Sequence, residues 1–296
     1  MLVVDKPAGW TSHDVVARVR RLASTRKVGH AGTLDPMATG VLVVGIGRAT
    51  RLLTFVTGAD KDYEATVRLG VTTTTEDAEG ERVDLVDASG VARAALDAAA
   101  GALTGDLLQV PSAVSAIKVD GQRAYARVRA GQDVQLAARP AHVARFDVLD
   151  VRDAQVDGVG VLDVDVQVTC SSGTYVRALA RDLGTALGVG GHLTALRRTR
   201  VGGYGIEDAR TLDDLGTTPD DEAVPVVPMA AAARAVLPAR ELSEAEARAL
   251  SYGQEVDADA APDGPLAAVG PDGTLVAVVE RRGSRLRPSV VFAPAS

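Results

Sequence analysis

The chain has 296 residues, of which 46% are hydrophobic and 24% are charged, and its single cysteine is Cys170. This length and hydrophobicity allow a sizeable core, and a single cysteine excludes an internal disulfide framework. The formal net charge of -7 argues at first against a polyanionic partner. The charges are segregated, however, because residues 1–70 hold ten Lys and Arg against six Asp and Glu, and residues 71–110 hold two against eight. Since the local field of a cleft steers a ligand more than the total charge does, a nucleic-acid partner is not excluded.

The apolar runs are too short to span a bilayer, the longest being "GVLVVGIG" at 40–47. The first ten residues lack the basic leader and apolar core of a signal peptide, so we expect a cytoplasmic protein. The four histidines are far apart in sequence, and no Cys/His spacing resembles a zinc site, so we expect no metal. The histidines are His13, His30, His142 and His192.

The first third of the chain predicts strands and helices separated by breakers. Thr11 or Ser12 is suited to cap a helix at 13–23, because Val15, Val16 and Val19 recur on one helical face. Residues 61–70 alternate as a half-buried strand does. The other segments predicted here are a strand at 2–5, an irregular loop at 24–40, a buried strand at 40–47 and a helix at 48–56.

The middle of the chain predicts an acidic mobile segment, an antiparallel strand pair and two helices. The helix expected at 173–188 has Thr174 as a candidate cap. The other segments are the acidic segment 72–85, a helix at 91–104, a loop or short strand leading into a helix at 109–131, paired strands at 142–151 and 161–171, and a strand at 192–204.

The pattern as a whole favours an α+β fold with a mixed, mainly antiparallel central sheet and flanking helices. Residues 216–242 are rich in proline, alanine and acid, as linkers often are. We therefore expect a large domain over 1–230 and a small β-rich domain over 235–296.

Asp35 lies in "HAGTLDP", where neither helix nor strand periodicity calls for an acid. An Asp-Pro pair can simply initiate a turn, because proline pushes the preceding residue away from helical backbone angles. A catalytic role is the alternative, and the fragment alone favours the turn.

Four stretches of the sequence, in this order, resemble a known family, and the resemblance favours the catalytic role of Asp35. They are "DKPAGWTSHDVV", "VGHAGTLDPMATGVLVVGIGRATRL", "DKDYEATVRLG" and "CSSGTYVRALARDLG", the last followed by "HLTALRRTRVG". In order and spacing the chain resembles the bacterial tRNA pseudouridine 55 synthases, the TruB family, from residue 2 to about residue 210. The resemblance implies the pseudouridine synthase fold, with a small PUA-like domain at the C-terminus.

The resemblance also implies roles for seven residues, three of them catalytic. Asp35 would be the catalytic aspartate, Arg177 would pair with it, and Tyr63 would stack on the flipped uracil. Four residues would bind the substrate or support the site: Tyr175 as a second active-site tyrosine, Leu196 under the base, His30 against the RNA, and Lys6 behind the active-site loop. Without the resemblance, Tyr63 is better interpreted as an ordinary core tyrosine, and a surface position is the alternative for Arg177.

These residue types suit the reaction that the resemblance implies. Uridine is isomerised without redox change or energy input, so no cofactor is needed. A flipped base costs a few kcal/mol, and stacking on one aromatic ring returns about 1 to 3 kcal/mol. The aspartate must be ionised, either to attack C1' or to assist uracil's departure while a base removes the C2' proton, and a guanidinium holds it by a planar fork. Tyr175 or Tyr63 is a candidate for that base, and the two mechanisms stay open.

The partner implied is tRNA, through its T-arm stem-loop, bound by a monomer with no protein partner and no membrane. Arginines in "RVRRLASTRK" and "LRRTR" suit phosphate contacts. Two alternatives stand beside this interpretation. One is a non-catalytic RNA-binding or RNA-folding protein of the same fold. The other is a carboxylate-dependent hydrolase, which would need a second catalytic acid that these motifs do not provide.

Overall fold

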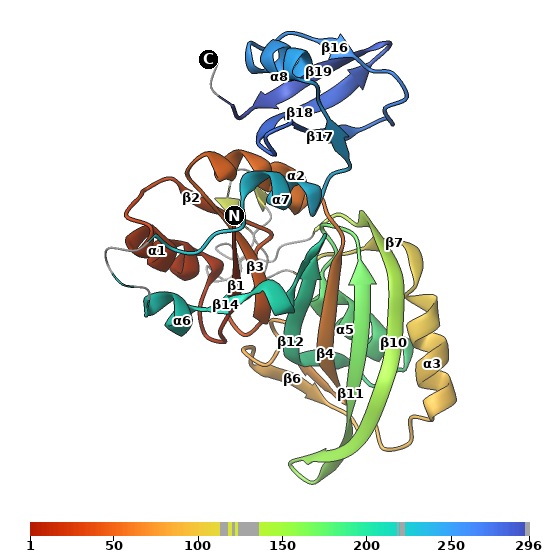
Figure 1. Cartoon of the computed structure of the whole chain (residues 1–296). Helices are drawn as coiled ribbons and strands as arrows, with labels where there is room; N and C mark the ends of the chain where they lie inside the picture. The colour runs from red at the N-terminus through yellow and green to blue at the C-terminus, as the bar shows by residue number, and fades with distance from the viewer. Residues whose placement is uncertain (113–117, 120–121, 124–135, 218, 220–222, 294–296) are drawn as a thin grey trace. The chain divides into compact units, whose positions relative to one another are not determined.

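The computed structural model describes residues 1–112, 118–119, 122–123, 136–217, 219 and 223–293 (Figure 1). The chain forms two compact units, each built from separate segments. Unit 1 comprises Met1–Asp35, Gly40–Ala59 and Arg200–Ser296, and unit 2 comprises Pro36–Thr39 and Asp60–Thr199. This division does not test the expected boundary at 230–235. The helix predicted within 109–131 falls mostly outside the described residues.

Unit 2 contains a five-stranded part of the main sheet, with helices against one face. Its strand order is β12 (Gly191–Val201), β4 (Lys61–Leu69), β11 (Val159–Cys170), β10 (Arg139–Val156) and β7 (Gly105–Gln109). The remaining elements are β5 (Val71–Thr73), β6 (Arg82–Leu85), α3 (Arg93–Ala102), β8 (Lys118–Val119), β9 (Gln122–Arg123) and α5 (Val176–Ala186). Strand β11 pairs antiparallel with both β4 and β10, as expected for the strand pair predicted at 142–171.

The alternation predicted for β4 is confirmed by its burial. Tyr63, Ala65 and Val67 are buried on the face that α5 contacts. The other face is polar and pairs across strands, because Arg68 donates two hydrogen bonds of 2.7 Å to its register partner Asp163. The period of two therefore separates a core face from a solvated face, as sheet geometry requires.

Glycine is required where α5 meets the start of β12. A Cβ at Gly184 would lie 2.1 Å from the carbonyl carbon of Gly190, which no side chain tolerates. The Gly184 carbonyl accepts hydrogen bonds from the amides of Val189 and Gly190, at 3.1 and 2.9 Å. The close approach fixes the turn that carries the chain from α5 into β12.

The strands of unit 1 that belong to the main sheet pair in both directions, so the sheet is mixed as predicted. Strand β1 (Leu2–Lys6) pairs parallel with β14 (Arg210–Thr211) and antiparallel with β3 (Thr39–Ile46), and β3 pairs antiparallel with β2 (Val28–Ala31). The other elements are α1 (Ser12–Leu22), the 3-10 helix η1 (Gly47–Leu52), α2 (Leu53–Thr57), β13 (Tyr204–Gly205), η2 (Ile206–Asp208) and α6 (Leu212–Gly216).

The alternating side chains of β1 and β3 enter two separate cores. Leu2 and Val4 pack with Val15 and Val19 of α1, and α6 closes the same cluster. Val3, with Val41 and Val43 of β3, belongs to a second cluster that includes α2, α7 (Met229–Arg234) and residues of the C-terminal sheet. A two-sided apolar strand pair such as this is buried on both faces.

The C-terminal segment is β-rich, as expected. Its sheet has the order β15 (Ala239–Glu241), β17 (Pro265–Val269), β18 (Leu275–Arg282), β19 (Arg285–Val291) and β16 (Val256–Asp257), with α8 (Glu244–Ser251) alongside. A separate apolar cluster including Leu250, Leu266 and Leu286 fills it. Arg51 of η1 reaches this segment, donating to the Val291 carbonyl at 2.6 Å and lying 5.3 Å from the Phe292 ring centroid.

Helix capping was predicted correctly for one helix and wrongly for another. Thr11 is the N-cap of α1 and forms a capping box with Asp14. The N-cap of α5 is Tyr175, whose side chain does not cap, whereas Thr174 lies one residue earlier with its hydroxyl 3.4 Å from that of Ser171. The predicted cap was wrong because α5 begins one residue later than the candidate requires.

Three segments predicted as irregular contain regular structure. The loop expected at 24–40 includes β2, whose short sequence forms a strand by pairing with β3. The acidic segment 72–85, expected to be mobile, belongs largely to the β5–β6 hairpin, with Asp77 only 3% exposed. The linker expected at 216–242 contains α7, which buries Ala232 and Ala233 in the unit 1 core.

Candidate active site

Asp35 lies on the connection between β2 and β3 in unit 1. The preceding backbone turns at Gly32, where φ is +76°, a region that glycine occupies without strain. Leu34 is buried at 4% exposure and Asp35 is half-buried. The acid therefore stands on an anchored connection rather than on a regular element, as its sequence context predicts.

Two buried polar side chains of unit 1 hold the backbone near this connection. Lys6 is fully buried at the end of β1, and its Nζ donates to the carbonyls of Pro7 and Trp10 at 2.9 and 2.6 Å. Ser12 is 1% exposed, and its hydroxyl bonds to both backbone polar groups of Leu34. The supporting role that the resemblance implies for Lys6 stays a prediction.

His30 lies on β2, opposite Val44 of β3. Its ring meets the ring of His13 edge to face, with 5.6 Å between centroids and 80° between planes. His13 is exposed on the first turn of α1, and His30 is half-buried. The two rings lie side by side, and His30 is two residues before Gly32, where the backbone turns towards Asp35.

Arg177 of unit 2 is buried, at 5% exposure, on the first turn of α5. Its Nη1 donates to the Thr75 carbonyl at 2.8 Å and to the Ser112 hydroxyl at 3.0 Å. Its Nε lies 3.6 Å from a carboxylate oxygen of Asp77. A cation on the first turn faces the positive end of the helix dipole, so these oxygens offset an unfavourable position.

Asp77 is the residue that sequence reasoning missed. Its carboxylate accepts from the Glu79 amide at 3.1 Å and from the Thr75 hydroxyl. The neighbouring Glu76 accepts from Arg181 at 2.7 Å, and its carbonyl accepts from the Leu193 amide at 3.0 Å. Residues 75–79 are therefore held in a fixed conformation beside Arg177. Its sequence, four threonines followed by acids, indicated only a polar segment.

Tyr63, Leu196 and Tyr175 also lie in unit 2, on three different elements. Tyr63 on β4 and Leu196 on β12 are each 7% exposed. Tyr175 is the N-cap of α5, and its backbone amide and carbonyl both bond to the side-chain amide of Gln109, at 2.8 and 3.1 Å. Gln109 thereby fixes the backbone that leads into Arg177.

The seven predicted residues fall into two sets. Unit 1 holds Asp35, Lys6 and His30, and unit 2 holds Tyr63, Tyr175, Arg177 and Leu196. The predicted pairing of Asp35 with Arg177 joins one unit to the other and stays a prediction.

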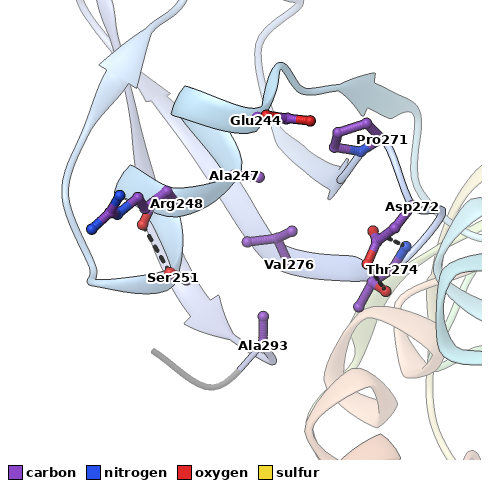
Figure 2. Close-up of a pocket in the computed structure, with 9 residues that line it drawn as sticks. All are labelled: Glu244, Ala247, Arg248, Ser251, Pro271, Asp272, Thr274, Val276 and Ala293. Carbon is purple, nitrogen blue, oxygen red and sulfur yellow. Dashed lines mark hydrogen bonds between the residues drawn. The ribbon is translucent and has the colours of Figure 1, made fainter. Parts of the chain in front are cut away.

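A metal-binding cluster and a membrane-spanning helix are absent from the residues that the structure describes. Among residues 1–112, 118–119, 122–123, 136–217, 219 and 223–293, no group of three or more His, Cys, Asp and Glu side chains is placed to hold a metal ion. The helices in these ranges are all too short or too polar to cross a membrane. A hollow beside α8 has Glu244, Arg248 and Asp272 among its lining residues (Figure 2). Its mixed charge does not favour a phosphate.

Comparison with known proteins gives matches along nearly the whole chain. A model of the TruB family pseudouridylate synthase N-terminal domain matches residues 20–176. A tRNA pseudouridylate synthase B C-terminal domain matches 177–241, and a tRNA pseudouridine synthase II C-terminal model matches 237–293.

Curated relatives and solved structures agree with these models. A tRNA pseudouridine synthase B of Arthrobacter sp. (strain FB24) is 59% identical over 304 residues, covering 100% of this chain and 97% of the relative. One from Streptomyces griseus is 54% identical, covering 99% and 97%. The Cbf5 complex with Nop10 and Gar1 gives a TM-score of 0.73 at 27% identity, covering 99% of this chain and 85% of that one. The archaeal Nop10–Cbf5 complex gives 0.71 at 26%, covering 100% and 86%.

Fold and sequence together define a pseudouridine synthase, an isomerase that acts on RNA. The predictions of an α+β pseudouridine synthase fold with a β-rich C-terminal part are confirmed. Within this class, the chain belongs to the TruB family of pseudouridylate synthases.

Proposed function

We propose that this chain is a tRNA pseudouridine synthase that converts uridine 55 in the T arm of tRNA to pseudouridine. Family membership supports the reaction, and the family resemblance supports the position in tRNA. The structural observation that carries the proposal is the buried Arg177 guanidinium, which three polar partners hold in one orientation.

The reaction exchanges one glycosidic bond for another. The N1–C1' bond breaks, the freed uracil rotates, and a C5–C1' bond forms, while C5 loses a proton and N1 gains one. Asp35 acts as an ionised carboxylate, either by attacking C1' or by stabilising its positive charge while a base removes the C2' proton. The protein's own groups suffice for either route.

Arg177 holds the carboxylate of Asp35 in place during this exchange. The surroundings of Arg177 support the role, because Thr75, Ser112 and Asp77 fix the orientation of its buried guanidinium. A carboxylate held by a fixed, water-excluded cation keeps its charge and direction as the base leaves. The buried pair thus supplies preorganisation rather than a proton.

The flipped uracil stacks on Tyr63 and packs against Leu196. Both side chains are 7% exposed, which suits a pocket for one base. Stacking on one ring returns about 1 to 3 kcal/mol per base, comparable with the cost of flipping. Tyr175 stands on the backbone leading into Arg177, as a second tyrosine facing the substrate.

The RNA backbone binds to exposed basic residues of unit 1. Arg21, Arg26 and Lys27 are exposed at the end of α1 and in the segment after it. Each phosphate that they neutralise releases counterions, so affinity falls steeply with salt. Recognition of the T arm rests on shape and on unstacked bases, as is usual for RNA. His30 lies against the RNA beside the vacated stack.

Domain roles, oligomeric state and location complete the proposal. Residues 1–230 form the catalytic domain, and residues 235–296 form a PUA-like domain that adds RNA affinity. The enzyme works as a monomer in the cytoplasm, where its tRNA substrate is found.

The test is release of tritium from a T-arm hairpin carrying uridine labelled at C5. We expect release by the unaltered chain and none by Asp35→Asn, with hairpin binding retained, because the amide is nearly isosteric but not nucleophilic. Near-normal release by Asp35→Asn would show that Asp35 is not the catalytic group. Binding without release by the unaltered chain would favour the non-catalytic RNA-binding alternative or a different target uridine.

A further inference from the structure

Ser12 is a buried polar residue whose hydroxyl both accepts and donates a hydrogen bond. The Oγ accepts from the Leu34 amide at 2.9 Å and donates to the Leu34 carbonyl at 3.2 Å. The two residues are 22 positions apart, and both are almost completely buried. One side chain therefore satisfies the donor and the acceptor of a single distant residue, which a strand partner would otherwise satisfy.

Helix formation does not explain this serine. Ser12 is the first residue of α1, and Thr11 already caps the helix with a capping box to Asp14. Alanine has a higher helix propensity than serine and would fill a buried position on this helix without needing a hydrogen-bond partner. The hydroxyl is therefore retained for Leu34 and not for α1.

The position of Leu34 in the chain links its contact with Ser12 to Asp35. Pairing of β2 with β3 ends at Ala31, opposite Val43, and pairing of β1 with β3 ends at Lys6, opposite Gly40. Asp35 lies on the span between these two ends. Leu34 is its immediate neighbour, and consecutive Cα atoms are about 3.8 Å apart, so a fixed Leu34 restricts where Asp35 can stand.

The other side of the contact is fixed as well. Lys6 holds the carbonyls of Pro7 and Trp10, just before α1 begins. The sheet thus supports the helix start, and the helix start supports Leu34.

We infer that Ser12 is a positioning residue for the reaction, which holds the Asp35 carboxylate at its working position through the Leu34 backbone. This inference rests on the proposed function, because it takes Asp35 as the catalytic acid. Ser12 itself touches no substrate.

The test compares Ser12→Ala with Thr11→Ala in the full chain. Thr11→Ala removes the helix cap beside Ser12 but leaves both bonds to Leu34, so it serves as the matched control. The readout is the single-turnover rate of tritium release at saturating hairpin, together with the hairpin Kd. We expect Ser12→Ala to lose about 10- to 100-fold in rate, the range that a displacement of about 1 Å costs, with Kd unchanged. Thr11→Ala should lose less than about threefold, a loss below that range.

A second variant and a second measurement separate positioning from folding. Ser12→Cys keeps nearly the same volume but forms only weak hydrogen bonds, so its rate should fall with that of Ser12→Ala. Amide hydrogen exchange should show faster exchange at Leu34 in both Ser12 variants and not in Thr11→Ala.

Each outcome has a distinct meaning. Equal losses in Ser12→Ala and Thr11→Ala, or normal rates in both Ser12 variants, would overturn the inference while leaving Asp35 as the catalytic acid. Retained activity in Asp35→Asn would instead overturn the proposed catalytic role, whatever the Ser12 variants do.

Discussion

Removing the charge of Asp77 while keeping its shape should destabilise unit 2 and slow the reaction. Asp77→Asn removes the carboxylate charge that lies 3.6 Å from the Nε of Arg177, whose own exposure is only 5%. Breaking a buried ion pair from one side costs about 3 to 5 kcal/mol. We expect about 3 kcal/mol, because asparagine still accepts from the Glu79 amide and Arg177 keeps its bonds to Thr75 and Ser112.

The assay is urea unfolding of the full chain followed by circular dichroism, with tritium release measured in parallel. A loss of about 3 kcal/mol corresponds to roughly a hundredfold change in the folding equilibrium. Asp163→Asn is the matched control, because Asp163 pairs with Arg68 on the solvated face of the sheet, at 18% and 29% side-chain exposure. Because that pair is partly exposed, its loss should cost less than the loss of the buried pair, about 1 kcal/mol, with little effect on turnover. If Asp77→Asn costs no more than Asp163→Asn, the buried pair does not hold Arg177 and the reasoning fails.

Two further predictions concern cations of unit 2. Arg177→Lys should lower turnover more than hairpin affinity, because a single ammonium cannot reach Thr75, Ser112 and Asp77 at once; equal losses in both would indicate a phosphate contact instead. Burial lowers the pKa of Lys61 from 10.5 to about 8, so the unfolded chain binds more protons than the folded chain between these values. The free energy of unfolding that depends on Lys61 should therefore rise with pH from about 8 to 10.5. Lys61→Met should be more stable than the unaltered chain at low pH, and this advantage should shrink across that range. Urea titrations of both proteins at pH 7.5 and 10 would measure the difference. A difference that does not change with pH would contradict the shift.

Sequence patterns predicted the parts of the fold that follow from local periodicity. The alternation of β4 and the Thr11 cap of α1 each depend on residues within a few positions of one another. Strand β2 was missed because four residues reading VGHA have no period, and only their partner β3 makes them a strand. Local rules cannot supply a pairing partner from outside the segment.

The candidate site shows the same division. Asp35 stood out because an acid between glycine and proline needs explaining, and the family resemblance then supplied its role. Asp77 did not stand out, because a carboxylate is normally exposed and is buried only where a charged or hydrogen-bonding partner lies beside it. That cation, Arg177, is 100 positions later in the chain and lies on a helix turn where a positive charge is unfavourable. The burial of Asp77 and the position of Arg177 are therefore explained only by the contact between the two residues.

The cluster around Arg177 also bears on how the enzyme is made. Its hydrogen bonds join residues 102 and 65 positions apart, so closing it requires long loops to be brought together. Non-local contacts of this kind form slowly, and the ribosome releases the N-terminal basic segment well before residue 177 is synthesised. Under the proposed function, a nascent chain therefore exposes its basic segment before the cluster that holds Arg177 has formed, and in that interval it binds RNA without altering it.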